Sequence, residues 1–352
     1  VEVSPMNITP ALSLPAIDPT SLVRGKPTAR LIASSINENG NWVRTFSVKG
    51  HLMILPESNT HRTDSKSIQS GRAVPTVTLR ERMLSDIAYP VYYGKNRPGM
   101  SAVEETLEYV RHPFTGAMLR PDEAWKAMAE MNAAWCEALT EAKWHKQLSN
   151  RPMSPFLYYH GTITATERDN YYGLRRHADA QPEIRALADA MWEAEQAAPP
   201  PKLLKPGEWH TPWVEEEDHE TIHACILQHN LPSEAFTMLV NLVSAARCAR
   251  SSYSTFDGRR STVESDIALC LKLIKSDPVH ASPFEHPCTP DKVTLMKQGF
   301  VKDNAYSVCA VWNHPDDHRN FKGWRQLRAF LERGELNYLL EGPVAKQFLL
   351  EG

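Results

Sequence analysis

Short segments in which apolar and polar residues alternate predict two strands in the first half of the chain. Residues 45–48 read Thr-Phe-Ser-Val, and residues 162–166 read Thr-Ile-Thr-Ala-Thr. Longer segments with helical apolar spacing predict helices over residues 121–147, about 167 or 169 to 198, 234–250, 263–275 and 323–333. We therefore expect an α/β fold with a mixed sheet and flanking long helices. No Gly-x-Gly-x-x-Gly or phosphate-loop motif supports a doubly wound dinucleotide fold.

The predicted helix over residues 121–147 carries an aromatic stripe. Trp125, Met128, Trp135 and Leu139 fall near one helical face, and Pro121 followed by two acidic residues suits a helix start. An apolar stripe at this spacing is more often a core face than a cofactor-binding surface. We interpret it as core.

Proline and charge patterns suggest the domain organisation. Residues 1–28 carry five prolines and no periodicity, so they are expected to form an irregular N-terminal arm. Residues 29–352 are expected to form a single catalytic domain. A stretch rich in Pro, Trp and acidic residues at about 199–232 is interpreted as a connection or insertion within it.

Composition excludes several classes of protein. The chain has 352 residues, of which 42% are hydrophobic, so it is long enough to bury a full core. Its net charge of −3 gives no general attraction to a nucleic acid polymer. The six cysteines form no Cys-x-x-Cys pair, which argues against a disulfide framework.

No apolar run approaches the roughly 20 residues of a membrane span, and the N-terminus lacks a secretory pattern. We expect a soluble cytoplasmic protein without a membrane partner, in the host cytoplasm if the chain is viral.

Residues 59–73 form a polar run that suits a phosphate ligand. Arg62 and Arg72 can each offer two parallel N–H donors to phosphate oxygens. Ser65, Ser70 and the backbone around Gly71 add neutral donors at close range. Taken alone, the run is better explained as a solvated basic loop, because Ser, Lys and Arg are ordinary surface residues.

The spacing of this run resembles the signature of flavin-dependent thymidylate synthases, Arg-His-Arg-x-x-Ser-x-Asn-Glu-x-Ser-x-Arg-Tyr. Five of its nine fixed positions are matched, at His61, Arg62, Ser65, Ser70 and Arg72. The family's first Arg, its Asn-Glu pair and its Tyr are replaced here by Thr60, Ser67, Ile68 and Ala73. The resemblance implies flavin contacts from His61, Arg62 and Ser65, and substrate contacts from Ser70, Gly71 and Arg72.

A second element, Asn-Tyr-Tyr-Gly-Leu-Arg at residues 170–175 followed by Ala-Gln-Pro-Glu-Ile-Arg at 180–185, resembles the family's Asn-Phe-Phe-x-Leu-Arg and Ala-Gln-x-Glu-Ile-Arg. By position, Arg175 corresponds to the arginine that meets the pyrimidine ring, and Asn170 to a flavin contact. A fixed cation beside a ring carbonyl stabilises the electron-rich ring that reacts at C5. Arg175 is therefore the predicted catalytic residue and also a substrate ligand.

Three further segments resemble family elements. His280, Ser282, Glu285 and His286 match a flavin-binding His-x-[Ser/Thr]-x-x-Glu-His, and residues 249–253 resemble the Ala-Arg-Val-Ser segment, which makes Ser252 another flavin contact. Residues 150–155 resemble an Ala-Arg…Pro segment with Arg151 as a phosphate ligand. Residues 208–210, Glu-Trp-His, resemble a segment of bacteriophage-type members.

The resemblance spans roughly residues 45 to 328, and the motif order is permuted relative to classical members, as in the bacteriophage-type forms. Gln326 and Arg328 are candidates to replace the Gln and Arg that the family places just before its His-Arg.

The resemblance implies FAD-dependent transfer of a one-carbon unit from methylenetetrahydrofolate to C5 of a pyrimidine deoxynucleotide monophosphate, most simply dUMP to dTMP, with NADPH as electron source. It also implies a homotetramer with FAD and nucleotide bound between subunits. Methylation or hydroxymethylation of dCMP, or hydroxymethylation of dUMP, remains an alternative. A carboxylate in the pocket, such as Glu57 or Asp64, would favour cytosine because it accepts from the N4 amino group.

One motif indicates a different class of enzyme. His219, Glu220 and His223 satisfy His-Glu-x-x-His, the pattern of a zinc hydrolase. His229 falls where an extended motif has its third ligand, but Ile226 occupies the position of the required glycine. We interpret the segment as an exposed helix start, predict no metal ligands, and keep a zinc hydrolase as the remote alternative.

Overall fold

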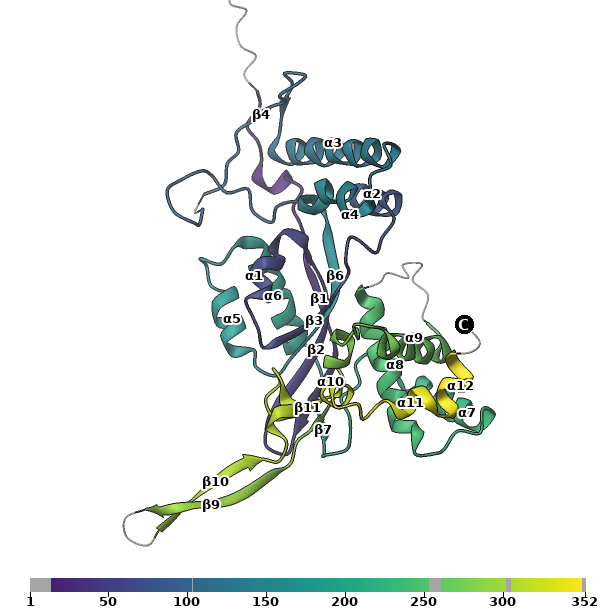
Figure 1. The fold of residues 1–352 in the computed structure, drawn as a ribbon. Coiled ribbons are helices and arrows are strands. Elements are labelled where there is room, and N and C mark those ends of the chain that lie inside the picture. Colours follow the sequence, from purple (N-terminus) through teal and green to yellow (C-terminus); the bar gives the residue numbers. More distant parts are fainter. Residues whose placement is uncertain (1–13, 103, 253–260, 302–304, 350–352) are drawn as a thin grey trace, which may run out of the picture.

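The computed structural model describes residues 14–102, 104–252, 261–301 and 305–349, with only the backbone of 251–252, 296–301, 305–310 and 349. Its centre is a five-stranded sheet in the order β3-β6-β2-β1-β7 (Figure 1). The strands are β1 (Thr28–Asn37), β2 (Trp42–His51), β3 (Asp64–Ile68), β6 (Tyr158–Ala165) and β7 (Lys202–Leu204). Four strands pair antiparallel and β7 pairs parallel to β1, so the predicted mixed sheet is confirmed.

One face of the sheet is apolar. Phe46 and Val48 of β2 and Ile163 of β6 point to this face and pack against Ile184 and Leu187. Ile184 and Leu187 belong to α6 (Pro182–Gln196), which lies across β1 and β2. Beside α6 lie α5 (Asp169–Arg175) and α1 (Leu55–Asn59). We call this the apolar face.

The opposite face carries hydroxyl groups, because side chains alternate along a strand. Thr45, Thr162, Thr164, Ser65 and Ser67 are all buried there. We call it the hydroxyl face. It is covered by α8 (Ala235–Ser252), which packs on β6 and β3.

The largest hydrophobic cluster lies beyond α8 and joins the helices of the C-terminal half. These helices are α7 (Glu216–Gln228), α9 (Val263–Lys275), α10 (Leu327–Glu332), α11 (Tyr338–Glu341) and α12 (Pro343–Leu349). The predicted helix over 263–275 is confirmed at both ends. The helix predicted over 323–333 is shorter than expected, because residues 324–326 pair as a strand.

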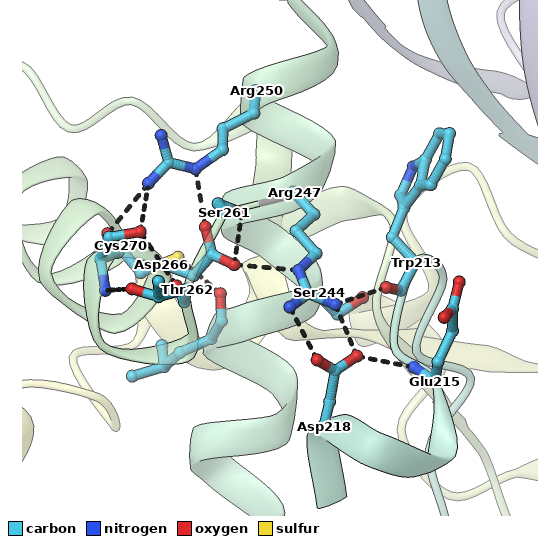
Figure 2. Close-up of polar contacts among 12 residues, drawn as sticks. Trp213, Glu215, Asp218, Ser244, Arg247, Arg250, Ser261, Thr262, Asp266 and Cys270 are labelled. Atoms are coloured by element: carbon cyan, nitrogen blue, oxygen red, sulfur yellow. Dashed lines mark hydrogen bonds and ion pairs between the residues drawn. The ribbon is translucent and has the colours of Figure 1, made fainter. Parts of the chain in front are cut away.

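Arg247 of α8 ties α7, α8 and α9 together through ion pairs (Figure 2). Its Nη1 and Nη2 donate to the two carboxylate oxygens of Asp218 at 2.6 and 2.8 Å, and its Nε donates to Asp266 at 2.9 Å. Arg250 also donates to Asp266, at 2.6 Å. Asp266 is completely buried and also accepts from the Ser261 hydroxyl at 2.8 Å, so the two arginines and this serine stabilise a buried anion.

A separate helical group lies at one end of the sheet (Figure 1). It comprises α2 (Thr76–Ser85), α3 (Pro121–Glu141), α4 (Lys146–Ser149) and the 3-10 helix η3 (Arg151–Phe156). The prediction that the aromatic stripe of α3 is a core face holds for Trp125, which packs against a buried cluster, but was wrong for Trp135 and Met128, which are 61% and 45% exposed. Small residues, Ala129, Ala133 and Cys136, form the buried face instead, because α2 and η3 approach α3 closely there.

Two other predicted helices end earlier than expected. α3 stops at Glu141, and Lys143 takes a φ of 64°, which interrupts the helix before α4. The helix predicted to reach residue 198 is divided into α5 and α6. The Gln181 side chain accepts from the Ile184 amide at 3.4 Å, and Pro182 occupies the first turn, so α6 has its own start.

Three two-stranded ribbons complete the fold: β8 (Cys288–Pro290) with β11 (Trp324–Gln326), β9 (Val293–Val301) with β10 (Ala305–Trp312), and β4 (Val110–Arg111) with β5 (Met118–Leu119). The β9/β10 ribbon projects away from the sheet (Figure 1). None of the described helices is both long and apolar enough to cross a membrane. The five cysteines with described side chains are buried outside any disulfide, and the side chain of Cys309 lies outside the described residues.

Candidate functional site

The polar run over residues 59–73 is organised around the edge strand β3 and is not the continuous loop that the sequence suggested. β3 pairs with β6 on one side and forms the end of the sheet. The pairing is close: a Cβ on Gly161 of β6 would lie 2.8 Å from the carbonyl oxygen of Ser67. Side chains of β3 alternate between the apolar and hydroxyl faces at this edge of the sheet.

On the apolar face, Arg175 meets His61. Arg175 lies in the last turn of α5, and its Nε donates to Nε2 of His61 at 2.7 Å. Its Nη2 donates to the Thr60 hydroxyl at 3.0 Å. Burial lowers the pKa of His61, and the charge of Arg175 lowers it further against the opposing effect of Asp64. His61 is therefore a neutral acceptor that holds the guanidinium in place.

On the hydroxyl face, Ser65 meets the C-terminal segment. Asn320 Nδ2 donates to Ser65 Oγ at 3.0 Å and to the Thr63 carbonyl at 3.2 Å. Gln326 Nε2 donates to Asn320 Oδ1 at 2.7 Å, which fixes the orientation of the Gln326 amide. Gln326 is completely buried, and its Oε1 has no hydrogen-bond partner. An orphaned acceptor of this kind suits a ligand N–H.

Next to Gln326 is a pocket of about 280 Å³ that we call the arginine pocket. Arg328 forms ion pairs with Glu285 and, at 2.7 Å, with Glu332. Arg319 pairs with the second oxygen of Glu332. The two predicted site residues Glu285 and Arg328 thus contact one another, although they are far apart in sequence.

A second pocket, of about 180 Å³, lies on the other side of the 3-10 helix η4 (Ser282–Glu285). We call it the serine pocket. It is lined by Ser67 and Ser70 from the β3 region, by His280 from the segment before η4 and by Ser282 at the start of η4. The pocket brings together two of the motifs that the sequence separates by about two hundred residues.

The turn at residues 70–74 is held to α4 and η3 by Asn150. Its Nδ2 donates to the Gly71 carbonyl at 2.8 Å and to the Val74 carbonyl at 3.1 Å. Arg72 and Arg151, the two predicted phosphate ligands, are both exposed on the segments that Asn150 joins. The predicted phosphate-binding residues therefore belong to one local surface.

Some predicted flavin contacts lie apart from these pockets. Asn170 lines a cavity of about 450 Å³ with Trp42 and Arg168. Arg62 is exposed after α1. The side chain of Ser252 lies outside the described residues. Asn170 therefore lines neither the arginine pocket nor the serine pocket.

Sequence reasoning missed two contacts of this region. The Asp64 side chain is 1% exposed and forms an ion pair with Arg168, at 3.3 Å, and with Lys66, at 3.5 Å. Asn320 had no assigned role, although it connects Ser65 to Gln326. Neither contact leaves a periodic signal in the sequence, because each joins segments far apart along the chain.

Two buried histidines lie in segments that resemble family elements but were given no role of their own. His286 contacts Ser67 through Nε2 at 2.9 Å and Thr164 through Nδ1 at 2.8 Å. His210 contacts Thr45 through Nε2 at 2.8 Å and Ser35 through Nδ1 at 2.9 Å. Burial lowers the pKa of each imidazole to about 3, with a further lowering of His210 by His286. Both rings are neutral near pH 7.

These two histidines are expected to make folding stability fall in acid. The unfolded chain binds a proton at each histidine below about pH 6.5, whereas the folded chain does so only near pH 3. Each histidine therefore lowers the free energy of unfolding by about 1.4 kcal/mol for every unit by which the pH falls between these two values. Urea unfolding between pH 7 and pH 4 measures the slope, and His286→Gln should reduce it. An unchanged slope in that variant would contradict the assignment.

The His-Glu-x-x-His segment lies on α7, as a helical motif requires. His223 stacks on Phe236 with ring centroids 4.0 Å apart, and His219 contacts the same ring edge-on. Across the described part of the chain, no group of three or more His, Cys, Asp or Glu side chains is placed to hold a metal ion. Within the described residues, the two imidazoles of the motif therefore pack on Phe236 and have no third ligand beside them.

Comparison with solved structures finds partial similarity to two enzymes. A UMP/dUMP methylase PolB from Streptomyces cacaoi, bound with 5-Br UMP, is 14% identical over 49% of this chain and 90% of its own, with a TM-score of 0.32. The flavin-dependent thymidylate synthase ThyX from Helicobacter pylori, complexed with FAD and dUMP, is 23% identical over 44% of this chain and 67% of its own, with a TM-score of 0.29. Overlaps this partial do not identify the activity of the chain. No protein-family profile and no curated protein matches the sequence.

Proposed function

We propose that this chain is a flavin-dependent enzyme that transfers a one-carbon unit to C5 of a pyrimidine deoxynucleotide monophosphate, converting dUMP to dTMP. One observation carries the proposal: segments that resemble the flavin-dependent thymidylate synthase motifs, far apart in sequence, contact one another around β3. Arg175 contacts His61, Gln326 lies 3.5 Å from Ser65, and Glu285 pairs with Arg328. Residues that serve one site are expected to converge in this way.

The residues around β3 suit a flavin. The serine pocket offers His280 and Ser282, both from the segment that resembles the family's flavin-binding element. The orphaned Oε1 of Gln326 is left to accept from a ring N–H of the nucleotide. When bound, FAD would supply the redox chemistry, with NADPH as electron source and methylenetetrahydrofolate as carbon donor. The residues proposed to hold it are His61, Arg62, Ser65, Asn170, Ser252, His280, Ser282 and Glu285.

Arg175 is the proposed catalytic residue. Its charge beside the pyrimidine carbonyl would stabilise the electron-rich ring that reacts at C5. The neutral His61 accepts from Nε and leaves the positive charge of the guanidinium uncompensated by that contact. The nucleotide phosphate is assigned to Ser70, Gly71, Arg72 and Arg151, and Gln326 and Arg328 complete the proposed substrate site.

The environment of Asp64 favours uracil over cytosine. A pocket carboxylate would accept from the cytosine N4 amino group, but Asp64 is buried and paired with Arg168. Glu57 is the other candidate carboxylate, and its buried Oε2 has no hydrogen-bond partner, so by the same argument it would favour cytosine. We propose dUMP as substrate on the family resemblance and on the pairing of Asp64, with dCMP and the hydroxymethyl products as alternatives.

A complete site is proposed to need more than one chain. The arginine pocket and the serine pocket, at about 280 and 180 Å³, are each smaller than the roughly 300–1,000 Å³ of typical ligand sites. Arg175 and His61 lie on the opposite face of the sheet from both pockets. The family resemblance implies a homotetramer with shared sites. In such an assembly, the pockets of one chain and the Arg175–His61 pair of another would together form one site.

Flavin binding tests the cofactor assignment. The purified protein is expected to be yellow and to release FAD on denaturation, measured by absorbance and by chromatography of the released flavin. A colourless protein that binds no added FAD, at concentrations where it is folded, would contradict the flavin part of the proposal.

Replacing Arg72 or Arg151 with alanine is expected to weaken dUMP binding by about 1.5–3 kcal/mol each, the value of a charged hydrogen bond to phosphate. FAD affinity should change less. Calorimetric titration of both ligands measures the difference, and Arg97→Ala, in an exposed loop away from β3, serves as the control. An unchanged dUMP affinity would remove the two arginines from the site.

A further inference from the structure

A cavity of about 420 Å³ lies at the base of the projecting β9/β10 ribbon (Figure 1). Lys292 immediately precedes β9 and Asn313 immediately follows β10, and both line the cavity. The turn at residues 206–209, the end of β8, and single residues of β11 and α10 form the rest of its wall. The volume falls within the roughly 300–1,000 Å³ of typical ligand sites. We call this cavity the ribbon pocket.

The ribbon pocket and the arginine pocket use different residues of β11. Gln326 lines the arginine pocket, whereas the preceding residue, Arg325, lines the ribbon pocket. Successive side chains of a strand point to opposite faces, so the two cavities lie on opposite sides of β11. They share no lining residue. A ligand of the ribbon pocket is therefore separate from the substrate of the proposed function.

One part of the ribbon pocket suits a flat ring. Trp209 and Phe330 are both half-buried, with ring centroids 5.6 Å apart. The guanidinium of Arg325 already lies over Phe330, at 4.6 Å from its centroid. Pro206 and Pro290 add apolar surface to the same wall. Trp209 is therefore the ring on which a planar ligand would stack.

Two hydrogen bonds hold the turn that carries Trp209. Glu208 Oε2 accepts from the Lys205 amide at 2.7 Å, and the Gly207 amide donates to the Thr289 hydroxyl at 3.0 Å. The second bond attaches the turn to β8. Trp209 belongs to the Glu-Trp-His segment that the sequence singled out, and the proposed function gives its side chain no role. The turn thus fixes this indole at the wall of the pocket.

The polar part of the ribbon pocket offers donors from two cations. Arg325 donates from Nε to Asp317 at 2.8 Å, and its two Nη atoms have no partner among the described residues. Asp317 also pairs with Arg333, so its charge is shared between two arginines. Lys292 is exposed, and its Nζ has no partner within the same part of the chain. These groups are free to bind an anion.

A cationic ligand is disfavoured because the carboxylate that lines the pocket is fully used. The two oxygens of Asp291 accept from the amides of Lys292 and His314, each at 2.8 Å. They also accept from His314 Nδ1 and His318 Nε2, each at 3.0 Å. A carboxylate has about four lone-pair sites, so Asp291 has none left for a metal ion or a ligand N–H.

We propose that the ribbon pocket binds a nucleoside phosphate, with the base stacked on Trp209 and the phosphate held by Arg325 and Lys292. Two positive charges suit a phosphate monoester, which carries about −1.5 to −2 at pH 7, better than a singly charged carboxylate. The paired Nη donors of Arg325 also match phosphate oxygens. This inference does not rest on the proposed function.

AMP is the probe, because its purine base distinguishes it from the pyrimidine nucleotide of the proposed function. Calorimetric titration should show one AMP site per chain, with adenosine and inorganic phosphate each binding at least about tenfold more weakly, since each makes only part of the contacts. In NMR of protein labelled with nitrogen-15 tryptophan, AMP should shift the Trp209 indole signal, assigned from Trp209→Phe. Absent AMP binding, equal affinity for adenosine and AMP, or an unchanged Trp209 signal would overturn the proposal.

Variants test the assigned contacts. Lys292→Ala is expected to weaken AMP binding by about 10–100-fold, the effect of one charged hydrogen bond, and its exposed side chain can be removed without loss of packing. Lys272→Ala, which removes an exposed lysine of α9, is the matched control and should leave AMP affinity unchanged. Equal AMP affinity in Lys292→Ala and the unmodified chain would overturn the proposal. A protein that binds AMP at Trp209 but binds no dUMP would support it and contradict only the proposed function.

Discussion

Replacing Arg247 with alanine is expected to lower the free energy of unfolding by about 3–5 kcal/mol, the usual cost of removing one partner of a buried ion pair. Arg247 is 8% exposed and donates to two buried carboxylates, Asp218 and Asp266, on different helices. Its removal would leave Asp218 without its bidentate partner and Asp266 with Arg250 as its remaining arginine (Figure 2).

The measurement is urea unfolding at pH 7, followed by circular dichroism. Lys126→Ala is the control, since Lys126 forms an exposed pair with Glu130 at 3.8 Å that should contribute less than about 1 kcal/mol. If Arg247→Ala lowers the free energy of unfolding by less than about 1 kcal/mol, the ion-pair cluster does not stabilise the packing of α7, α8 and α9.

Arg175→Ala is expected to lower kcat for the nucleotide reaction by about 10²–10³-fold, the usual effect of removing one group that stabilises transition-state charge. Stability and bound FAD should be retained, because Arg175 lies in the last turn of α5 and is only partly buried. Arg175→Lys keeps the charge but not the fixed geometry that His61 gives the guanidinium, so it should recover only part of the activity.

Single-turnover kinetics at saturating dUMP measure this effect. The neighbouring Arg176, which pairs with the exposed Asp189 at 2.8 Å, provides the matched control. Arg176→Ala should change kcat less than about threefold. Equal losses in both variants would indicate a general disturbance of α5 and would remove Arg175 from the catalytic role.

The sequence predicted those parts of the fold that depend on local periodicity. The strands at 45–48 and 162–166 lie within β2 and β6, and the helix over 263–275 has the bounds of α9. The sequence-based prediction failed where tertiary contacts determine which face of a helix is buried. The stripe of Trp135 and Met128 has helical spacing, but the close approach of α2 and η3 selects the small residues of α3 for the buried face.

The site was predictable only as separate segments. Motif spacing singled out His61, Arg175, Glu285 and Arg328, and the structure brings them into contact in pairs. It could not indicate that β3 separates these pairs onto two faces of a sheet. Nor could it indicate that His210 and His286 contact hydroxyls from four strands, because strand register brings these hydroxyls to one face and tertiary packing places the two rings there.

Mass analysis of the nucleotide product tests the proposed function most directly, because it reports the base and the oxidation level of the added carbon together. With FAD-loaded protein, methylenetetrahydrofolate and NADPH under anaerobic conditions, dUMP should be converted to a product heavier by one methyl group, and dCMP should be recovered unchanged. Turnover of dCMP alone, or a hydroxymethyl product, would contradict the substrate or product assignment. Recovery of both nucleotides unchanged would contradict the proposed enzymatic function itself.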